Sequence, residues 1–462
     1  MDAWQGIEGR RVERHHGAPR FEVDQEQWLA AAEALGEERL TLSGLWGDDG
    51  VVHMALLAED AGELAVLTLA CPDGFFPSVS RLHPPAIRPE RTVRDLFGLV
   101  PRDAPDMRPW LDHGRWGVRH PLGGREEREA GGDAYAYAFL PVEGEGLHRI
   151  PVGPVHAGII EPGHFRFTVN GETVVRLEAR LGYVHKGVEA LMKGATLDRA
   201  ALLAGRVSGD STVAYALAFS RAAEAALGVE APPRAVFLRA LMAELERLAN
   251  HLGDIGAICN DAAFSLMLAH CGVLRERVLR ASDAAFGHRL MRDRIVPGGV
   301  AADLGGEGVS AIREAVAEIR ARFPELVELY DSTTSLQDRT VATGILKPEL
   351  AKRFGAGGHV GRASGRGFDA RRALAYPPYD RLSFEVPVFS EGDVNARVWV
   401  RIREVEQSLS LVEQILASLP GGAIAAAIGL TGGEGVAVVE AFRGDVLVWL
   451  RVGVDGRVER CH

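Results

Sequence analysis

Cysteine is scarce in this sequence. The chain of 462 residues has four cysteines (Cys71, Cys259, Cys271 and Cys461), and no two of them form a Cys-x-x-Cys pair. This is not the spacing of a disulfide-rich scaffold, and it is typical of a protein from a reducing compartment. We therefore predict a cytoplasmic location.

Long apolar runs are also missing. No uninterrupted apolar run of the sequence reaches the roughly 20 residues that a helix needs to cross a bilayer. The first residues are polar, and they are followed by Arg10, Arg11 and Arg14 rather than by an apolar segment. We therefore expect no secretory signal and no membrane-spanning helix.

Basic residues are outnumbered by acidic ones. The chain has 52 Lys and Arg against 63 Asp and Glu, a formal net charge of -11, and no locally concentrated basic patch. Such a surface repels phosphates, so we expect no nucleic-acid partner. No Gly-x-Gly-x-x-Gly segment follows a predicted strand, so direct nicotinamide binding is not expected either.

Length and composition indicate a globular protein with more than one domain, because 47% of its residues are hydrophobic. Residues 25–101 have the pattern of a small α/β unit, with a helix through Trp28 and strands near residues 51–57 and 63–69. The stretch 123–133 is rich in Gly and charge and predicts a linker. Residues 165–169 and 173–177 then predict a hairpin around Asn170-Gly171.

Most of the remaining chain predicts packed helices. Apolar residues recur three and four apart over residues 181–290, 309–329 and 398–419. Residues 355–372 predict a loop, and residues 436–454 predict two strands joined at Arg443-Gly-Asp. We predict an α+β protein with a small N-terminal α/β domain (residues 1–122), a linker (123–148) and a mainly helical domain with a β entry hairpin (149–462).

Three segments of the first domain carry a family resemblance. They are Phe-Pro-Ser-Val-Ser-Arg-Leu-His at residues 76–83, Glu-Arg-Thr-Val-Arg-Asp-Leu-Phe-Gly-Leu at 90–99 and Pro-Asp-Met-Arg-Pro-Trp-Leu at 105–111. They resemble the 30-kilodalton subunit of respiratory complex I, which implies a docking domain without chemistry. As single residues, Arg94 and Asp95 have an alternative interpretation in which they only cap and solvate a helix and have no role in docking.

Six blocks in one order carry a second resemblance. They are the segments at residues 151–167, 181–189 (Leu-Gly-Tyr-Val-His-Lys-Gly-Val-Glu), 244–257 (Glu-Leu-Glu-Arg-Leu-Ala-Asn-His-Leu-Gly-Asp-Ile-Gly-Ala), 296–300, 377–380 and 391–398. They resemble the 49-kilodalton subunit of complex I and, more closely, the large subunit of group 4, energy-converting nickel-iron hydrogenases such as formate hydrogenlyase. This implies an iron-sulfur small subunit with a 4Fe-4S cluster as partner, antiporter-like membrane subunits, and a peripheral place on the inner face of the cell membrane.

The nickel ligands of that family are replaced in this sequence. The resembling hydrogenases have Arg-Ile/Val-Cys-Gly-x-Cys where this chain has Arg206-Val-Ser-Gly-Asp-Ser, so Ser208 and Ser211 occupy both thiolate positions. A serine hydroxyl is a harder and far more basic donor than a thiolate. The second cysteine pair belongs beyond residue 456 and is either lost or missing from a truncated sequence. We expect no metal in this subunit and no hydrogenase activity.

A polar pocket beside the partner's cluster should remain once the metal is removed. By resemblance we expect its candidate catalytic residues to be His156, Glu161, His164, Arg206 and Asp210, with Ser208, Ser211, His185 and Glu178 binding a candidate quinone. Histidine and a buried carboxyl could protonate a reduced quinone. For His156 and His164, an ordinary hydrogen-bonded loop histidine is a nearly equal interpretation. Tyr183 and His185 do not obviously match the tyrosine and histidine that hold the quinone in complex I.

The sequence leaves two functions open. One is a nickel-free oxidoreductase subunit of a membrane-associated complex, which couples redox chemistry at a neighbouring iron-sulfur cluster to quinone or proton transfer. The other is a non-catalytic scaffold of such a complex. Retained charged residues in the pocket favour the first, and bulky apolar residues filling it would favour the second. On the segment 244–257, Glu246, Asn250 and Asp254 share one helix face, which we expect to line a cavity or a contact with another subunit.

Overall fold

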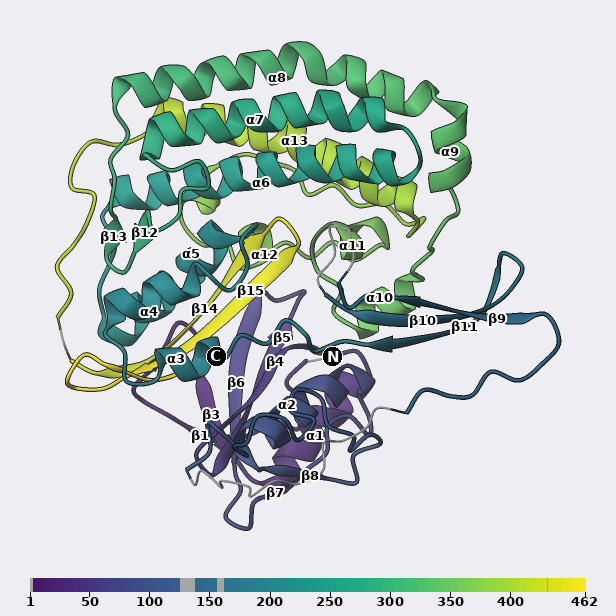
Figure 1. Ribbon diagram of the computed structural model, residues 1–462. Helices are drawn as coiled ribbons and strands as arrows, with labels where there is room; N and C mark the ends of the chain where they lie inside the picture. Colours follow the sequence, from purple (N-terminus) through teal and green to yellow (C-terminus); the bar gives the residue numbers. More distant parts are fainter. Residues whose placement is uncertain (1–2, 125–137, 156–161, 430) are drawn as a thin grey trace.

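A computed structural model describes residues 3–124, 138–155, 162–429 and 431–462 of the chain. It confirms the α+β class: an N-terminal mixed sheet with its helices lies below a long helical bundle, and a small sheet projects to one side (Figure 1). The predicted linker segment 123–133 falls mainly outside the described residues.

The N-terminal unit is built on a five-stranded sheet in the order β1-β3-β6-β5-β4, in which only β3 and β6 pair in parallel. Helix α1 begins at the N-cap Asp24, whose carboxylate accepts the N–H of Gln27 at 2.9 Å. The elements are β1 (Arg10–Arg11), β3 (Arg20–Val23), α1 (Gln25–Gly36), β4 (Thr41–Asp48), β5 (Val51–Ala58), β6 (Glu63–Ala70), β7 (Phe75–Pro77), η1 (Pro84–Ala86), α2 (Ile87–Phe97) and β8 (Val100–Arg102).

The motif at residues 90–99 is structural. The buried carboxylate of Glu90 accepts hydrogen bonds from the backbone N–H groups of Val79 and Ser80 and from two serine hydroxyls of the same turn. Asp95 accepts the N–H groups of Trp110 and Leu111, both at 2.8 Å. The motif thus ties α2 to the segments before and after it, because a buried carboxylate must have its hydrogen bonds satisfied.

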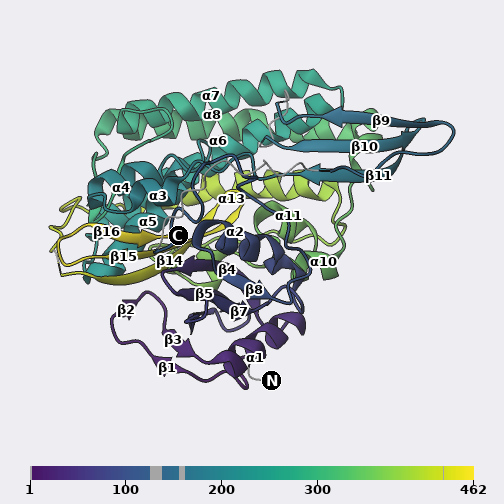
Figure 2. The ribbon, with the colours of Figure 1, turned by 60° about the horizontal axis from the view of Figure 1, so that its bottom comes forward.

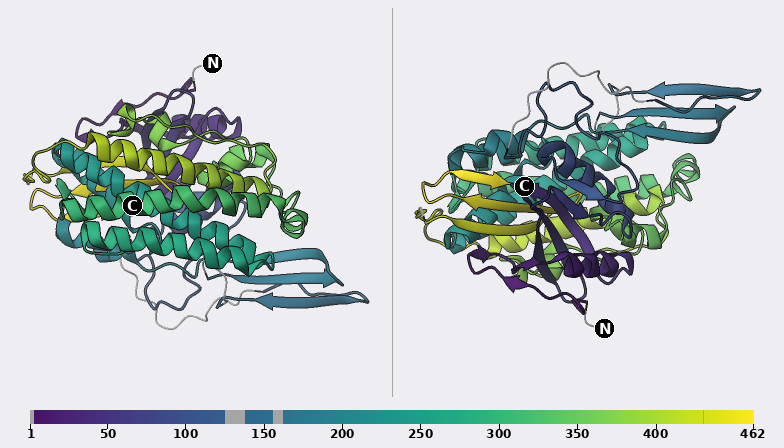
Figure 3. Two further views of the ribbon diagram at one scale, coloured as in Figure 1. Left: turned by 90° about the horizontal axis from the view of Figure 1, so that it is seen from above. Right: turned by 90° about the horizontal axis from the view of Figure 1, so that it is seen from below.

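A three-stranded antiparallel sheet projects from the body (Figures 1 and 3). Its hairpin is present as predicted, but the turn lies one residue later, at Gly171-Glu172, because Asn170 still pairs with Thr173; Gly171 takes the positive φ of +57° at the first position of the turn. The strands are β9 (Leu147–Val152), β10 (His164–Asn170) and β11 (Thr173–Arg180).

The helical body is a bundle in which α6 packs on α7 and α13, and α8 packs on α7 and α13 (Figure 1). Helix α6 starts with a proline at its first position, and most of its side chains are buried. The helices are α3 (Val188–Met192), α4 (Leu197–Ala204), α5 (Thr212–Leu227), α6 (Pro233–Asp261), α7 (Ser265–Phe286), α8 (Gly306–Ser332), α9 (Thr334–Thr340), α10 (Pro348–Arg353), α11 (Gly358–Ala363), α12 (Ala370–Ala373) and α13 (Val394–Ser418), with η2 (Tyr379–Arg381) and the small pair β12 (Ile295–Val296) and β13 (Gly299–Val300).

The predicted loop at residues 355–372 is wrong in part, because it contains α11 and the start of α12. Its residues are held by tertiary contacts that local composition does not reveal. Arg362 is fully buried and pairs with Glu404 and with Glu440, the latter at 2.9 Å. Long-range ion pairing therefore overrides the weak helix propensity of this glycine-rich segment.

A second sheet, in the order β16-β15-β14-β2, joins the two parts of the molecule (Figure 2). Helix α5 packs on β14 and β15, while Trp449 of β15 packs against Trp46 of β4, with ring centroids 5.8 Å apart. The ring of His462 also stacks on Trp46 at 4.8 Å. The strands are β2 (His15–His16), β14 (Gly433–Ala441), β15 (Gly444–Val452) and β16 (Val458–Cys461).

Candidate functional site

A cavity of about 760 Å³ lies between the segment before α3, the start of α5 and the turn of the β14–β15 hairpin. Its walls are mostly polar or small. The described residues that line it are Pro162, Tyr183, Val184, Lys186, Val207, Ser208, Gly209, Ser211, Tyr215, Ala441, Arg443, Gly444, Asp445 and Val446.

The two serines predicted to replace thiolate ligands, Ser208 and Ser211, lie together on the turn that precedes α5. The hydroxyl of Ser208 donates to Asp210 Oδ1 at 2.6 Å, and that of Ser211 donates to the same oxygen at 3.3 Å. The other carboxylate oxygen of Asp210 pairs with Arg443 at 2.5 Å. Asp210 therefore links the serine turn to the hairpin turn.

Sequence reasoning missed Arg443 and Asp445 as site residues. Arg443 lies in the hairpin turn and Asp445 at the start of β15, and both line the cavity, about 230 residues in sequence from Ser211 by their residue numbers. Burial raises the pKa of Asp445, an effect that Arg366 partly offsets. The available signal was the Arg443-Gly-Asp junction between two predicted strands, but nothing local in the sequence places that turn beside Ser208.

Buried ion pairs hold the hairpin turn in place. The guanidinium of Arg247, on α6, donates to the carbonyls of Glu440 and Ala441 at 2.9 and 3.0 Å. Arg247 is itself paired with Glu244 at 3.4 Å, and both side chains are buried. The turn that carries Arg443 is thus fixed by a charge network in the core, which favours a preorganised cavity wall.

A smaller cavity of about 320 Å³ adjoins the first, and Gly209 lines both. Its walls include Asp210, Glu246 and Asn250, in line with the prediction that this face of α6 borders a cavity. The Glu246 carboxylate accepts the N–H groups of Val213 and Ala214 at 2.7 and 3.1 Å. Burial nevertheless raises the pKa of Glu246 to about 8.

Two further candidate residues lie near the cavity but do not line it. Arg206 forms a two-pronged ion pair with Asp293, and this pairing raises the pKa of Arg206. His185 stacks on Trp116 with ring centroids 5.3 Å apart, and burial lowers its pKa. Of the pair Tyr183 and His185, only Tyr183 lines the cavity.

The projecting sheet carries two other candidates. His164, at the start of β10, lies 5.1 Å from the ring of Phe139, and burial lowers its pKa. Glu178, on β11, accepts the N–H of Leu140 at 2.9 Å and pairs with Arg176 at 3.4 Å. His156 and Glu161 lie outside the described residues.

The donors present do not fit a thiolate-bound nickel and iron pair. Ser208 and Ser211 offer hydroxyl oxygens, which are already hydrogen-bonded to Asp210. Cys461 is buried on β16, and burial raises the pKa of its thiol to about 12, so it is not a ready thiolate. Over the described ranges, no group of three or more His, Cys, Asp or Glu side chains is arranged to hold a metal ion.

Comparison with known proteins assigns the family. Residues 21–128 match the respiratory-chain NADH dehydrogenase 30 Kd subunit, and residues 261–451 match the 49 Kd subunit. Formate hydrogenlyase subunit 5 of Escherichia coli is 32% identical over 402 residues, which cover 83% of this chain and 69% of that protein. Hydrogenase-4 component G of the same organism is 31% identical over 450 residues, covering 94% and 76%. The chain belongs to the family of these hydrogenase subunits.

Fused proteins of NADH-quinone oxidoreductase belong to the same group of relatives. The C/D fusion protein of this oxidoreductase from Bacteroides thetaiotaomicron is 29% identical to this chain over 465 residues, covering 94% of the chain and 86% of that protein. The resemblance inferred from the sequence blocks is therefore confirmed for both parts of this hydrogenase-family chain. In the described part of the chain, no helix combines the length and apolar character needed to cross a membrane.

Proposed function

We propose that the chain is a nickel-free, hydrogenase-like large subunit of a membrane-associated electron-transfer complex related to respiratory complex I. In this role it couples electron transfer at the iron-sulfur cluster of a neighbouring small subunit to quinone or proton transfer. Its membership of a family that contains hydrogenase and NADH-quinone oxidoreductase subunits supports the oxidoreductase assignment.

The observation that carries this proposal is the open cavity at the serine turn, whose wall carries polar and charged side chains. A scaffold that had lost turnover would be under no pressure to keep a cavity of about 760 Å³ there, since filling it with apolar side chains stabilises a fold. Ser208 and Ser211 are small, and Arg443 and Asp445 place charge on the wall. These features favour a redox or proton-transfer role over a scaffold.

The residues of the cavity suit proton movement. The pKa of Asp445 is raised, so this carboxyl can hold a proton at the cavity wall. The pKa of Glu246, which borders the adjoining cavity, is raised to about 8. Asp210, in the hydrogen-bonded serine turn, lines the smaller cavity with Glu246 and pairs with Arg443 of the hairpin turn. A carboxyl whose pKa lies near the working pH is an efficient proton donor and acceptor.

A quinone, if bound here, would supply two-electron, two-proton acceptor chemistry. The cavity offers the Tyr183 side chain and the protonatable Asp445 to a quinone headgroup. We infer that Tyr183 orients the ligand and that Asp445 delivers one of the two protons, the second coming from solvent through the open cavity. The roles first predicted for His156, Glu161, His164, Arg206, His185 and Glu178 stay predictions.

The proposal also includes partner subunits and a peripheral place at the inner face of the cell membrane. One face of the projecting sheet is apolar and exposed: the neighbouring Ile150, Phe167 and Leu177 form a row across its strands, and Ile150 and Leu177 are 48% and 52% exposed. An exposed apolar sheet face is typical of an interface between subunits. We assign it to the contact with a partner subunit such as the iron-sulfur protein.

The first experiment is elemental analysis of the purified native complex for nickel and iron, combined with a hydrogen-uptake assay. We expect iron from the partner's cluster, no nickel and no hydrogen uptake. Stoichiometric nickel in this subunit would overturn the proposal.

A cavity-filling variant separates the redox role from the scaffold role. Ser208→Leu should lower electron-transfer turnover of the native complex by about tenfold or more, because the side chain occupies the cavity. Ser310→Leu, at an exposed position of α8, is the matched control and should leave turnover unchanged. Unchanged turnover in an assembled Ser208→Leu complex would instead identify a scaffold.

A further inference from the structure

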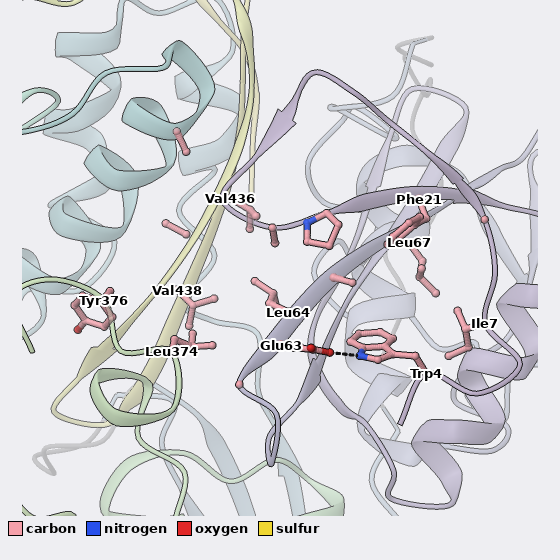
Figure 4. Close-up of a pocket in the computed structure, with 18 of the residues that line it drawn as sticks. Trp4, Ile7, Phe21, Glu63, Leu64, Leu67, Leu374, Tyr376, Val436 and Val438 are labelled. Carbon is pink, nitrogen blue, oxygen red and sulfur yellow. Dashed lines mark hydrogen bonds between the residues drawn. The ribbon is translucent and has the colours of Figure 1, made fainter. Parts of the chain in front are cut away.

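A further, larger cavity lies away from the serine turn, at the joint between the N-terminal unit and the helical body. Its volume is about 980 Å³. Strands β6 and β14, helix α5 and the first residues of the chain form its walls. Figure 4 shows the labelled side chains extending from Tyr376 at one end, past Val438, Leu64 and Val436, to Ile7 at the other.

One unpaired cation lies at the Tyr376 end. Arg221, on α5, lines the cavity and lies over the ring of Tyr376, 4.8 Å from its centroid. Its Nε is buried and has no hydrogen-bond partner among the described residues, and burial lowers the pKa of the guanidinium. Glu224, the acidic group that acts electrostatically on Arg221, is already bound by Arg239 and by the N–H of Gly298.

Arg221 is half-buried and its Nε is left without a hydrogen bond, so an anion that reaches the guanidinium from the cavity would satisfy it. The other walls of the cavity are mostly apolar, so they suit a ligand whose remaining part is apolar. Two polar side chains of the lining bind each other, because Trp4 Nε1 donates to Glu63 at 2.9 Å. The other polar side chains of the lining are those of Glu8, Arg221 and Tyr376. A peptide would bring a polar amide at every residue that such walls do not satisfy, whereas an alkyl chain needs no hydrogen bonds.

We propose that this cavity binds a single-chain amphiphile with one carboxylate, of the long-chain fatty acid class, with the carboxylate on Arg221 and the alkyl chain along β6 and β14. A single unpaired cation at one end of an elongated apolar cavity matches one anionic head and one tail. The site goes beyond the proposed redox function and does not depend on it, since it lies at the joint of the two units rather than at the serine turn.

Binding of dodecanoate to the purified full-length protein, measured by isothermal titration calorimetry below its micellar concentration, tests the site. We expect saturable binding of one dodecanoate per chain, tighter than that of octanoate because more methylene groups are buried. Arg221→Gln should weaken dodecanoate binding by roughly tenfold to a hundredfold and leave binding of uncharged dodecan-1-ol unchanged. Arg221→Lys should retain most of the dodecanoate affinity.

Two further variants fix the location. Ala225→Phe adds a ring where α5 borders the cavity and should abolish binding of both ligands, with Leu64→Trp as a second block should the first fail to fold. Arg277→Gln, which removes an exposed ion pair of α7 with Glu318, is the control and should bind normally. No saturable binding, equal dodecanoate affinity in Arg221→Gln, or binding to phosphatidylglycerol vesicles without binding of dodecanoate would each overturn the proposal.

Discussion

Glu246 shows how one buried carboxyl can make stability depend on pH. Its pKa rises from 4.5 to about 8 in the folded chain, because burial raises the pKa by more than the hydrogen bonds from two backbone N–H groups lower it. The folded state therefore holds this proton more tightly than the unfolded state does. The resulting stabilisation is complete below about pH 4.5 and is lost as the pH rises through about 8.

We predict that Glu246→Gln removes this dependence. The free energy of unfolding of the variant, relative to the natural chain, should rise by a few kcal/mol between pH 5 and 9, since each unit of pKa difference corresponds to about 1.4 kcal/mol. Denaturant titrations across that range measure the difference. Glu314→Gln, on the exposed face of α8, is the control, and parallel curves for Glu246→Gln and the natural chain would contradict the prediction.

At this scale, the sequence reveals the residues whose neighbours are local. Ser208 and Ser211 stand in one short motif, and the structure brings them together on one turn with Asp210. Arg443 reaches the same place only through the fold, because a hairpin more than 200 residues later delivers it. Sequence spacing cannot predict such a contact, since it depends on how β14 packs on α5.

Among the elements, the projecting sheet has the clearest division of faces. Ile150, Phe167 and Leu177 point to one side because they are register partners, whereas Arg149, Thr168 and Arg176 are partners on the other. The apolar side has no cover from the described residues at Leu177, which is 52% exposed. A sheet of this kind gains stability when a partner covers that side.

We predict that Leu177→Arg weakens assembly with the partner subunit by about tenfold or more, because it places a charge in the apolar contact. The thermal stability of the isolated chain should change little, since the side chain is exposed. Analytical ultracentrifugation and co-purification of the native complex measure the effect. Arg149→Gln, on the opposite face, should assemble normally, and equal loss in both variants would place the contact elsewhere.

The elements that the sequence predicted best are those with a strong period. The hairpin of β10 and β11 and the helix α13 lie within a few residues of their predicted bounds. Helix α11 was missed because its composition is glycine-rich and its stability comes from the buried pairing of Arg362. Charge pairs between distant segments leave no periodic trace in a sequence.

For the whole molecule, the joint between the two units determines cooperativity. Trp449 is fully buried against Trp46 and His53, and Arg451 pairs with Asp48 at 2.5 Å across the same joint. Arg460 also donates to the carbonyl of Gly47 at 3.1 Å. Such a buried, hydrogen-bonded joint couples the unfolding of the two units.

We predict one calorimetric unfolding transition for the natural chain. Trp449→Ala should lower the free energy of unfolding by about 3 to 5 kcal/mol, the range for removing a large buried aromatic side chain, and should lower the stability of both units together. Trp116→Ala, at a position 38% exposed, is the control and should cost about 1 kcal/mol or less. Two well-separated transitions in the natural chain would contradict this coupling.

The β14–β15 hairpin touches the serine cavity with its turn and the N-terminal unit with its strands. The covalent link between the two units is therefore not what holds them in register. If the chain were cut after Gly124, the two pieces would still bind each other through the tryptophan joint. Their association would then depend on the concentration of each piece, because the link no longer keeps them at a high effective concentration. Whether the two units are made as one polypeptide or as two, the same tryptophan joint has to form before the N-terminal unit is held on the β14–β15 hairpin.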